Sequence, residues 1–234
     1  GEYTRETRRW LNSRFDLFDK AGVYIPNQPV YGFSAEAFRL EEYARLYAVL
    51  RVLNRIRFDS LVDVGCADGF APALIQHLYK VDILGLDLSE KALLRACELY
   101  KIPGAAADAH QLPLPDNCCD VVMCTEVLEH VVDPVKVLSE LKRISRQYVL
   151  LSTPRASGNE SKANHFENLD PNEPHAHIHF FTDGEIRELC GKNSFYMGAR
   201  SRLINSLFDR LAWTDSSTYT QRKSYYEFTV SSAD

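Results

Sequence analysis

The sequence predicts an α/β fold with a doubly wound, mostly parallel sheet. From about residue 60 onward, short apolar runs alternate with stretches of helical periodicity, which is typical of consecutive β-α-β units. The apolar runs are nearly uninterrupted, as expected of parallel strands that helices cover on both faces. A chain of 234 residues is long enough to bury a full core in one such domain.

Two helices are expected before the sheet. Residues 3–19 predict a short helix, and a turn rich in Gly and Pro follows it. Ser34 can cap a longer second helix. The apolar stripe of that helix would consist of Leu40, Tyr43, Ala44, Tyr47 and Leu50. We therefore expect residues 1–56 to form a helical cap and residues 57–234 to form the α/β domain, within a single structural unit.

Five strands and three intervening helices are expected in the first part of the α/β domain. The strands lie at residues 60–64, 82–86, 104–107, 119–124 and 148–152. The helix after the first strand would bury Ala71, Leu74, Ile75 and Leu78. Ser89 can cap the next helix, whose buried stripe would be Leu93, Ala96, Cys97 and Tyr100. Asp133 and Pro134 suit the start of a third, because Pro is favoured at the first helical position. Its buried stripe would be Val137, Leu138, Leu141 and Ile144.

The composition changes after the fifth strand. Residues 155–174 are rich in Asn, Glu and Pro and are too many for a routine connection, so we expect a lid insertion at about residues 155–180. Thr182 and Glu185 have the spacing of a capping box, which predicts the start of another helix. Residues 194–203 and 223–231 are candidates for a closing pair of strands.

A ligand-binding turn is expected directly after the first strand. Residues 61–69 read Leu-Val-Asp-Val-Gly-Cys-Ala-Asp-Gly, and a helix follows. Gly65 and Gly69 would let the backbone approach a ligand closely, and the start of the helix offers unpaired N–H groups. The second strand ends at Asp87, whose carboxylate can accept hydrogen bonds from both hydroxyls of a ribose. This arrangement predicts a site for the nucleoside part of a cofactor.

The same turn is unsuited to a dinucleotide. Ala67 and Phe70 stand where the dinucleotide fingerprint requires Gly and then Gly or Ala. Asp68 would place a negative charge where the pyrophosphate lies, and that contact is repulsive. A cofactor with a cationic centre and no phosphate is favoured. S-adenosylmethionine fits, because it carries a sulfonium, an ammonium, a carboxylate and an adenosine.

Residues 59–189 resemble the class I S-adenosylmethionine-dependent methyltransferases, especially the group that includes the ubiquinone and menaquinone biosynthesis enzymes. The resemblance rests on Asp63-Val-Gly-Cys-Ala-Asp-Gly, on Glu126-Val-Leu-Glu-His-Val, and on His179-Phe-Phe-Thr-Asp-Gly-Glu-Ile. It implies a seven-stranded sheet whose last two strands are antiparallel, with an N-terminal helical cover. It also implies S-adenosylmethionine contacts at Asp63, Gly65, Cys66, Ala67, Gly69, Asp87, Leu88, Asp108, Ala109 and Thr125. Asp63 would orient the turn, Asp87 would bind the ribose, and Asp108 would meet the adenine amino group.

Methyl transfer is an in-line displacement from an activated sulfonium, so the protein mainly aligns the acceptor and excludes water. A hydroxyl or a protonated amine also needs a base, for which the candidates are Glu126, His130, His177 and His179. His177 and His179 are alternate residues and are expected to point together if the segment is extended. Tyr24, Tyr31 and Phe33 would line an apolar or planar acceptor, or else pack in the core.

Three other functions are compatible with parts of the sequence. Glu126-x-x-Glu129-His130 with a later histidine resembles the metal-ligand set of the small-RNA 3′-terminal 2′-O-methyltransferases. The net charge of −5 and the lack of an evident RNA-binding patch argue against nucleic acid, so no metal is expected. A non-catalytic S-adenosylmethionine-binding regulatory protein is the second alternative, and a nicotinamide dehydrogenase is the third.

Composition places the protein among ordinary globular proteins. No apolar run approaches the length of a membrane-spanning helix. The six cysteines fit reduced thiols better than a disulfide framework, which indicates the cytoplasm. Arg5, Arg8, Arg9 and Arg14 fit the solvated face of an amphipathic helix. We therefore expect a cytoplasmic methyltransferase for a small-molecule acceptor, with oxygen or nitrogen as the methylated atom.

Overall fold

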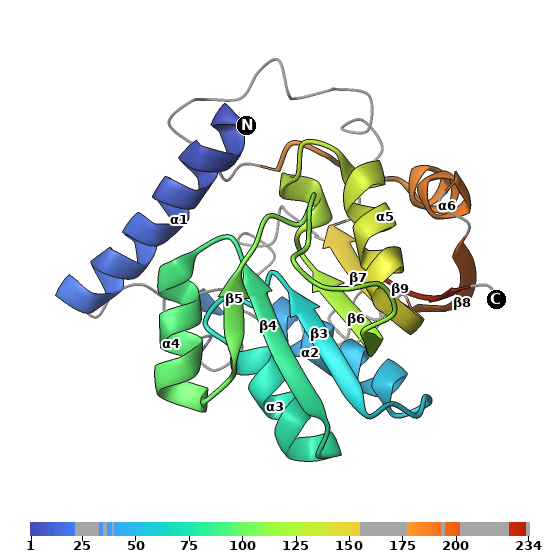
Figure 1. Cartoon of the computed structure of the whole chain (residues 1–234), viewed down its shortest axis with the longest axis horizontal. Helices are drawn as coiled ribbons and strands as arrows, with labels where there is room; N and C mark the ends of the chain where they lie inside the picture. The colour runs from blue at the N-terminus through green and yellow to red at the C-terminus, as the bar shows by residue number, and fades with distance from the viewer. Residues whose placement is uncertain are drawn as a thin grey trace.

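Five parallel strands form the centre of the protein, in the order β5-β4-β3-β6-β7 (Figure 1). Their bounds are β3 Ser60–Val64, β4 Asp82–Asp87, β5 Gly104–Ala106, β6 Cys119–Thr125 and β7 Ser145–Pro154. The computed structural model describes residues 1–21, 33–34, 37–38, 40–154, 177–192, 195–201 and 225–232. The chain order of the strands reverses between β3 and β6, as in a doubly wound sheet. The predicted α/β class and parallel sheet are confirmed.

Two antiparallel strands continue the sheet beyond β7. β9 (Tyr225–Ser232) pairs antiparallel with β7, and β8 (Phe195–Ser201) pairs antiparallel with β9. Their bounds overlap the two closing segments that the sequence indicates at residues 194–203 and 223–231. No helix among the described residues combines the length and the apolar character that a membrane crossing requires.

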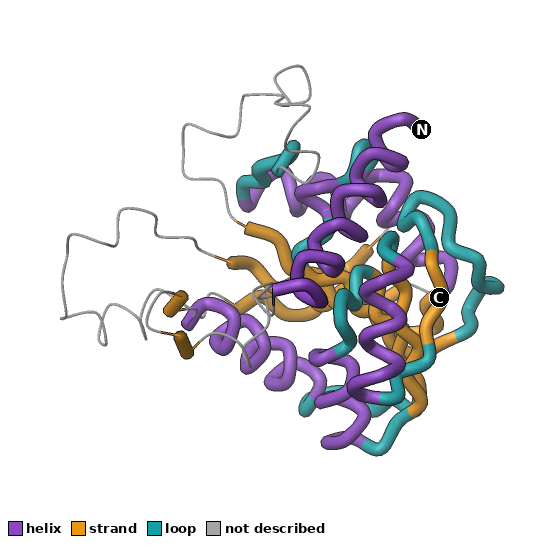
Figure 2. Tube along the Cα trace, turned by 90° about the vertical axis from the view of Figure 1, so that its left-hand side faces the viewer, coloured by secondary structure: helices purple, strands orange, loops and turns teal. Residues whose placement is uncertain are grey.

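Helices cover both faces of the sheet, and each face has its own hydrophobic core (Figure 2). One core includes α5 (Pro134–Ile144) and α6 (Asp183–Lys192), and the other includes α2 (Leu40–Leu53), α3 (Phe70–Tyr79) and α4 (Glu90–Tyr100). β6 shows why both faces need cover. Val121 and Met123 belong to the second core, whereas the intervening Val122 and Cys124 belong to the first. Side chains alternate across a strand, so an uninterrupted apolar strand is buried on both sides.

The predicted helix starts are confirmed where side chains are described. The Ser89 hydroxyl accepts a hydrogen bond from the Ala92 N–H, at 3.2 Å. Asp133 caps α5 through the N–H of Lys136, at 3.0 Å, with Pro134 in the first turn. Thr182 and Glu185 form a reciprocal capping box, because each side chain accepts a hydrogen bond from the other's backbone N–H.

Four predictions about local structure are wrong. The helix expected directly after Ser34 begins only at Leu40, because residues 33–34 and 37–38 pair as the short strands β1 and β2. Tyr47 is 57% exposed and lies beneath the Arg51 guanidinium, since α2 buries Ala48, Val49, Val52 and Leu53 instead. Leu78 is 52% exposed, because α3 turns Pro72 and Ile75 toward the sheet. Cys97 is also exposed, on the outer face of α4.

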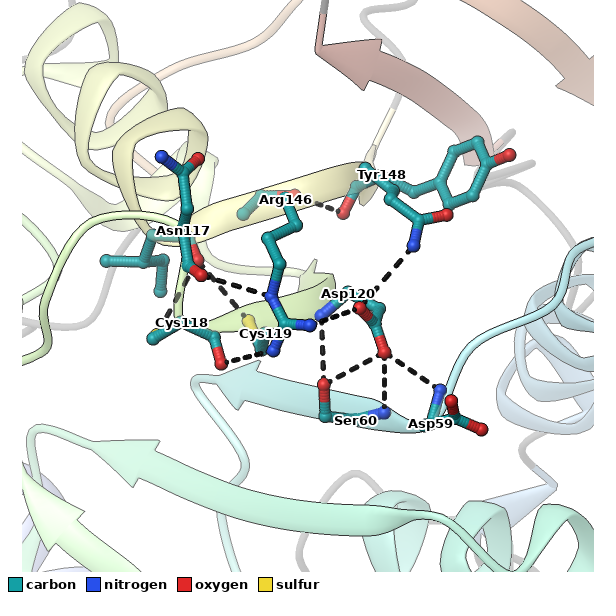
Figure 3. Close-up of polar contacts among 11 residues, drawn as sticks. Asp59, Ser60, Asn117, Cys118, Cys119, Asp120, Arg146 and Tyr148 are labelled. Carbon is teal, nitrogen blue, oxygen red and sulfur yellow. Dashed lines mark hydrogen bonds and ion pairs between the residues drawn. The ribbon is translucent and has the colours of Figure 1, made fainter.

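Polar contacts join β3, β6 and β7 at the amino-terminal ends of these strands, opposite the predicted site (Figure 3). We call this group, formed by Asp59, Ser60, Asp120 and Arg146, the polar clip. The Asp120 Oδ2 atom accepts the backbone N–H groups of Asp59 and Ser60, at 2.9 and 3.1 Å, and the Ser60 hydroxyl, at 3.1 Å. Its Oδ1 atom accepts from the Arg146 guanidinium, at 2.9 Å. Asp120 is only 5% exposed, so these donors replace water. The clip therefore links the three strands at their amino-terminal ends.

We predict that Asp120→Asn lowers the free energy of unfolding by about 1.5–3 kcal/mol at pH 7, the range for hydrogen bonds to a charged group. Burial alone would raise the pKa of Asp120, but the Asp59 N–H, Ser60 and Arg146 outweigh it, and the net shift is downward from 3.8. A lowered folded-state pKa gives stability that is complete above the unfolded pKa and is lost as the pH falls through the folded one. Denaturant titrations of both proteins at pH 7 and at pH 3 would therefore show a smaller difference at the lower pH.

Asp59→Asn is the matched control, because the Asp59 side chain is exposed and only its backbone N–H takes part in the clip. The control should unfold like the wild type at both pH values. An Asp120→Asn difference that does not shrink at pH 3 would contradict the electrostatic account of the clip.

Candidate functional site

The turn after β3 has the backbone that the glycine pattern predicts. Gly65, Ala67 and Gly69 all have positive φ angles, of 86°, 48° and 84°. A Cβ on Gly65 would collide with a methyl group of Val127, and a Cβ on Gly69 would lie 2.6 Å from the Ala96 Cβ. Ala67 takes the left-handed conformation despite its Cβ. The turn can therefore pass close to its neighbours only with glycine at both ends.

The end of β4 holds this turn in place. The N–H groups of Gly65 and Cys66 both donate to the Leu86 carbonyl, at 2.7 and 3.1 Å. The Ala67 N–H donates to the Asp87 Oδ2 atom, at 2.9 Å. We call the carboxyl ends of the parallel strands, with the turns that follow them, the rim. Cys66 is 2% exposed, and its sulfur packs over Gly85, so this residue presents its backbone rather than its thiol to the rim.

The Asp87 carboxylate keeps acceptor capacity after its internal bonds. Its Oδ1 atom accepts the Ser89 N–H at 2.8 Å, and Ala67 occupies one position on Oδ2. Burial raises the pKa of Asp87, while the N–H groups of Ser89 and Ala67 oppose that shift. A carboxylate offers about four lone-pair positions, and the Leu88 N–H also acts on this one, so some acceptor capacity remains for a ligand. Leu88 follows it and is half-buried.

Asp108 is held by a histidine that the sequence analysis missed. The Asp108 Oδ1 atom accepts both the backbone N–H of His110, at 3.0 Å, and its Nδ1, at 2.6 Å. The His110 Nε2 atom accepts the Asp133 N–H at 3.2 Å, which assigns the ring proton to Nδ1 in a neutral imidazole. The His110 hydrogen bond is the main cause of a lowered Asp108 pKa. The neighbouring Ala109 is half-buried. The i, i+2 spacing of an acid and a histidine in a turn is the signal that could have found this pair.

Acidic side chains gather beneath the rim, around β3 and the segment after β6. Asp63 is 2% exposed, and burial, aided by the charge of Asp87, raises its pKa to about 8, while Arg45 acts in the opposite direction. Arg45 of α2 lies 3.6 Å from the Glu126 Oε2 atom, and the Ser152 hydroxyl donates to Oε1 at 2.8 Å. Glu129 is 1% exposed, and burial followed by the charge of Glu126 raises its pKa. Arg45 was not predicted, since it looks like an ordinary surface residue of a helix.

The predicted bases do not all contact one another. His130, in the single turn η2 (Leu128–His130), lies with its ring centroid 4.7 Å from that of His177. His179 does not join them, because its Nε2 atom is 2.8 Å from the Val131 carbonyl and its ring stacks on Phe181. Burial lowers the pKa of His179. The expectation that His177 and His179 point together is wrong, because residues 177–180 do not form a strand.

Other predicted site residues can only partly be placed. Thr125 ends β6 and is half-buried. The side chain of Asp63 was expected to orient the turn, but its Oδ1 atom has no hydrogen-bond partner among the described residues. Tyr24 and Tyr31 lie outside the described residues, as does most of the predicted lid. Phe33 is in β1, where only the backbone is described.

The N-terminal helix α1 (Glu2–Ala21) lies beside α4 (Figure 1). The Ser89 hydroxyl donates to the Asn12 Oδ1 atom at 2.6 Å, and the Asn12 amide donates to Glu90 at 2.9 Å. Near the start of α1, the Tyr3 hydroxyl donates to the His130 carbonyl at 3.5 Å. α1 thus connects the start of α4 with η2, the two flanks of the rim.

Comparison with known proteins agrees with this geometry. Residues 62–151 match the family profile described as "Methyltransferase domain". The chain is 26% identical, over 148 residues, to a probable S-adenosylmethionine-dependent methyltransferase of Mycolicibacterium smegmatis, with 60% of this chain and 56% of that protein covered. It is 27% identical, over 153 residues, to a ubiquinone biosynthesis O-methyltransferase of Bordetella parapertussis, covering 56% and 63%. Residues 62–151 of this chain form a methyltransferase domain.

A solved structure has a similar fold. Geranyl diphosphate C-methyltransferase from Streptomyces coelicolor, solved in complex with Mg²⁺, geranyl-S-thiolodiphosphate and S-adenosyl-L-homocysteine, superposes with a TM-score of 0.71. The identity is 14%, with 100% of this chain and 99% of that chain covered, so the likeness is one of fold. The chain spans 56% and 63% of the two curated relatives named above. The Mycolicibacterium smegmatis relative is named as S-adenosylmethionine-dependent, and the Streptomyces coelicolor structure holds S-adenosyl-L-homocysteine.

We predict that Gly65→Ala destabilises the methyltransferase domain by about 2–5 kcal/mol, the sum of a left-handed backbone cost and an overpacking cost. Adding Val127→Ala removes the colliding methyl group and should recover the packing part, but not the backbone part. Thermal and denaturant unfolding of the single and double variants measures both parts.

Gly184→Ala serves as the control. Gly184 has no positive φ angle, and a Cβ there would lie 4.0 Å from the Thr182 hydroxyl, in open space within α6. This change should alter stability by no more than about 1 kcal/mol, in the stabilising direction. A Gly65→Ala protein as stable as the control would show that the turn is not constrained as described.

Proposed function

We propose that the protein transfers the methyl group of S-adenosylmethionine to a small-molecule acceptor, at a hydroxyl oxygen or an amine nitrogen. The single observation that carries the proposal is the hydrogen bond from the Ala67 N–H to Asp87, which brings the turn after β3 and the end of β4 to one point on the rim. In an open α/β sheet, ligands bind beyond the carboxyl ends of the strands, where the strand order reverses.

We assign the cofactor contacts from this geometry. The remaining acceptor capacity of Asp87 would bind the ribose hydroxyls, and the turn at residues 65–69 would approach the methionine part through its backbone. Asp108, oriented by His110, would accept from the adenine amino group, with Ala109, Leu88 and Thr125 beside the adenosine. These roles follow from position and hydrogen-bonding capacity.

The acidic groups of the rim support a cationic cofactor. Asp63 and Glu129 are buried and Glu126 is half-buried, and the Arg45 guanidinium lies 3.6 Å from Glu126. Burial raises the pKa of Asp63 and of Glu129, so a bound sulfonium or ammonium group would favour their ionised forms, whereas a pyrophosphate would oppose ionisation. This favours S-adenosylmethionine over a dinucleotide.

His130 is our candidate for the base, since it lies beyond the end of β6 and is 13% exposed at its side chain. Glu126 is paired with Arg45, and His179 is held by the Val131 carbonyl, so both are better suited to positioning. His177 lies against His130 and could accept a proton from it. Tyr24, Tyr31 and Phe33 remain our candidates for the walls of the acceptor site.

We also propose that the finer architecture follows the methyltransferase pattern. The sheet would have seven strands, with β9 and β8 as its antiparallel closing pair. Residues 1–56 would cover the rim, and residues 57–234 would form the α/β domain with a lid at about residues 155–180. The six free thiols support a cytoplasmic location.

Calorimetric titration tests the function. We expect S-adenosylmethionine and its demethylated product each to bind once per chain, and NADH not to bind. Transfer of a labelled methyl group to a panel of hydroxyl and amine acceptors then separates an enzyme from a regulatory binding protein. Absence of binding by both adenosyl ligands would overturn the proposal.

We predict that Asp87→Ala weakens S-adenosylmethionine binding by about 1.5–3 kcal/mol, or roughly tenfold to 150-fold in Kd. Calorimetry measures the change, and thermal unfolding must be measured alongside, since Asp87 also holds the turn. Asp82→Ala, at the exposed opposite end of the same strand, should leave Kd unchanged. An unaltered Kd in Asp87→Ala would remove this residue from the site.

A further inference from the structure

Three potential metal ligands from two segments of the chain converge at the rim. The ligand atoms of Glu129, His130 and His177 all lie within 4.8 Å of one another. The His130 Nε2 atom is 3.9 Å from the Glu129 Oε1 atom, and the two imidazole rings meet edge to face at 4.7 Å between centroids. No metal was expected from the sequence, because the net charge of −5 and the lack of an evident RNA-binding patch argued against the metal-dependent RNA methyltransferases.

The Glu129 carboxylate lacks a partner on the side that faces this cluster. Glu129 is 1% exposed, and its Oε2 atom accepts the Thr153 hydroxyl at 3.1 Å. Its Oε1 atom, the one nearest His130, has no hydrogen-bond partner among the described residues. A buried carboxylate oxygen without a donor is costly, and a bound cation removes that cost.

The backbone fixes the two segments against each other at this point. The Glu129 carbonyl accepts the N–H groups of both Ile178 and His179, at 2.7 and 3.1 Å. These bonds hold residue 177 opposite residue 130. The His179 ring is bonded to the Val131 carbonyl, which leaves His177 as the histidine of this segment that faces the cluster. The arrangement is thus set by the fold rather than by three independent rotamers.

We propose that Glu129, His130 and His177 bind a divalent first-row transition-metal ion that holds the oxygen of the methyl acceptor. Two imidazoles and one carboxylate suit such ions better than Mg²⁺ or Ca²⁺, which prefer oxygen ligands. Metal bonds of about 2.0–2.2 Å place ligand atoms roughly 3.0–3.5 Å apart, so the side chains would close inward on binding. Three protein ligands leave coordination positions open.

This proposal rests on the proposed function and narrows its acceptor to a hydroxyl compound. With a metal ion bound, His130 acts as a ligand and water replaces it as the proton acceptor. A metal-bound hydroxyl loses its proton to water more readily than a free one. The oxygen lone pair then forms the bond to the methyl carbon as the carbon–sulfur bond breaks, and its electrons remain on sulfur. The products are the methyl ether and S-adenosylhomocysteine. Amine acceptors gain nothing from this step, so hydroxyl acceptors are the preferred class.

Mn²⁺ is the probe for the test, because the six free cysteines would compete for Zn²⁺ but bind Mn²⁺ weakly. The electron paramagnetic resonance signal of free Mn²⁺ is followed during titration with tag-free protein. We expect one Mn²⁺ per chain, and at least tenfold weaker binding in Glu129→Gln and in His177→Gln. Mg²⁺ at equal concentration should not displace the ion, whereas Co²⁺ should.

Matched controls carry the same substitutions elsewhere. His77→Gln on α3 and Glu98→Gln on α4 change exposed residues and should bind Mn²⁺ like the wild type. Thermal unfolding shows that each variant is folded at the temperature of the titration. No Mn²⁺ binding at millimolar concentration, or equal binding by Glu129→Gln and wild type, would overturn the proposal.

Calorimetry with S-adenosylhomocysteine in the same samples separates the two claims. Binding of that ligand without Mn²⁺ binding would overturn the metal site and leave the methyltransferase function standing. Failure to bind S-adenosylhomocysteine would overturn the function itself. Methyl transfer to amines that equals transfer to hydroxyls, with no loss on removal of metal by EDTA, would also overturn the proposed role.

Discussion

The site depends on how the end of β4 holds the turn after β3. The Leu86 carbonyl accepts two backbone N–H groups of the turn, and the Asp87 carboxylate accepts a third. These bonds are possible because glycine stands at both ends of the turn, where a side chain would collide with Val127 or Ala96. A single acidic residue therefore shapes this loop and keeps acceptor capacity for a ligand. If Asp87 binds the ribose as we propose, a variant at this position changes both cofactor binding and local stability.

Buried acids give the rim its chemical character. Few donors face Asp63 and Glu129, and each has one carboxylate oxygen without a partner among the described residues. A protein does not keep such groups for stability, because desolvation costs more than the remaining contacts return. Under the functions that we propose, positively charged ligands account for these two acids. A sulfonium near Asp63 and a metal ion at Glu129 would then lie on either side of the methyl acceptor.

The sequence was most informative where local pattern alone decides the structure. The limits of β3, the caps at Ser89 and Asp133, and the box at Thr182 all follow from side chains within four residues of one another. Predictions failed where a neighbouring element decides, as at Tyr47 and Leu78, whose helices are rotated by the packing of their neighbours. Two sets of contacts at the site were missed for the same reason. The pairing of Arg45 with Glu126 and the meeting of His130 with His177 depend on contacts between distant segments, which one sequence does not display. His110 was missed although its partner Asp108 is only two residues away.

The most direct test of the account is a crystal structure of the protein with S-adenosylhomocysteine bound. The account predicts that both ribose hydroxyls lie within hydrogen-bond distance of the Asp87 carboxylate, that the adenine amino group faces Asp108, and that the sulfur lies over residues 65–69. A ligand bound elsewhere, or one whose ribose makes no contact with the end of β4, would contradict it.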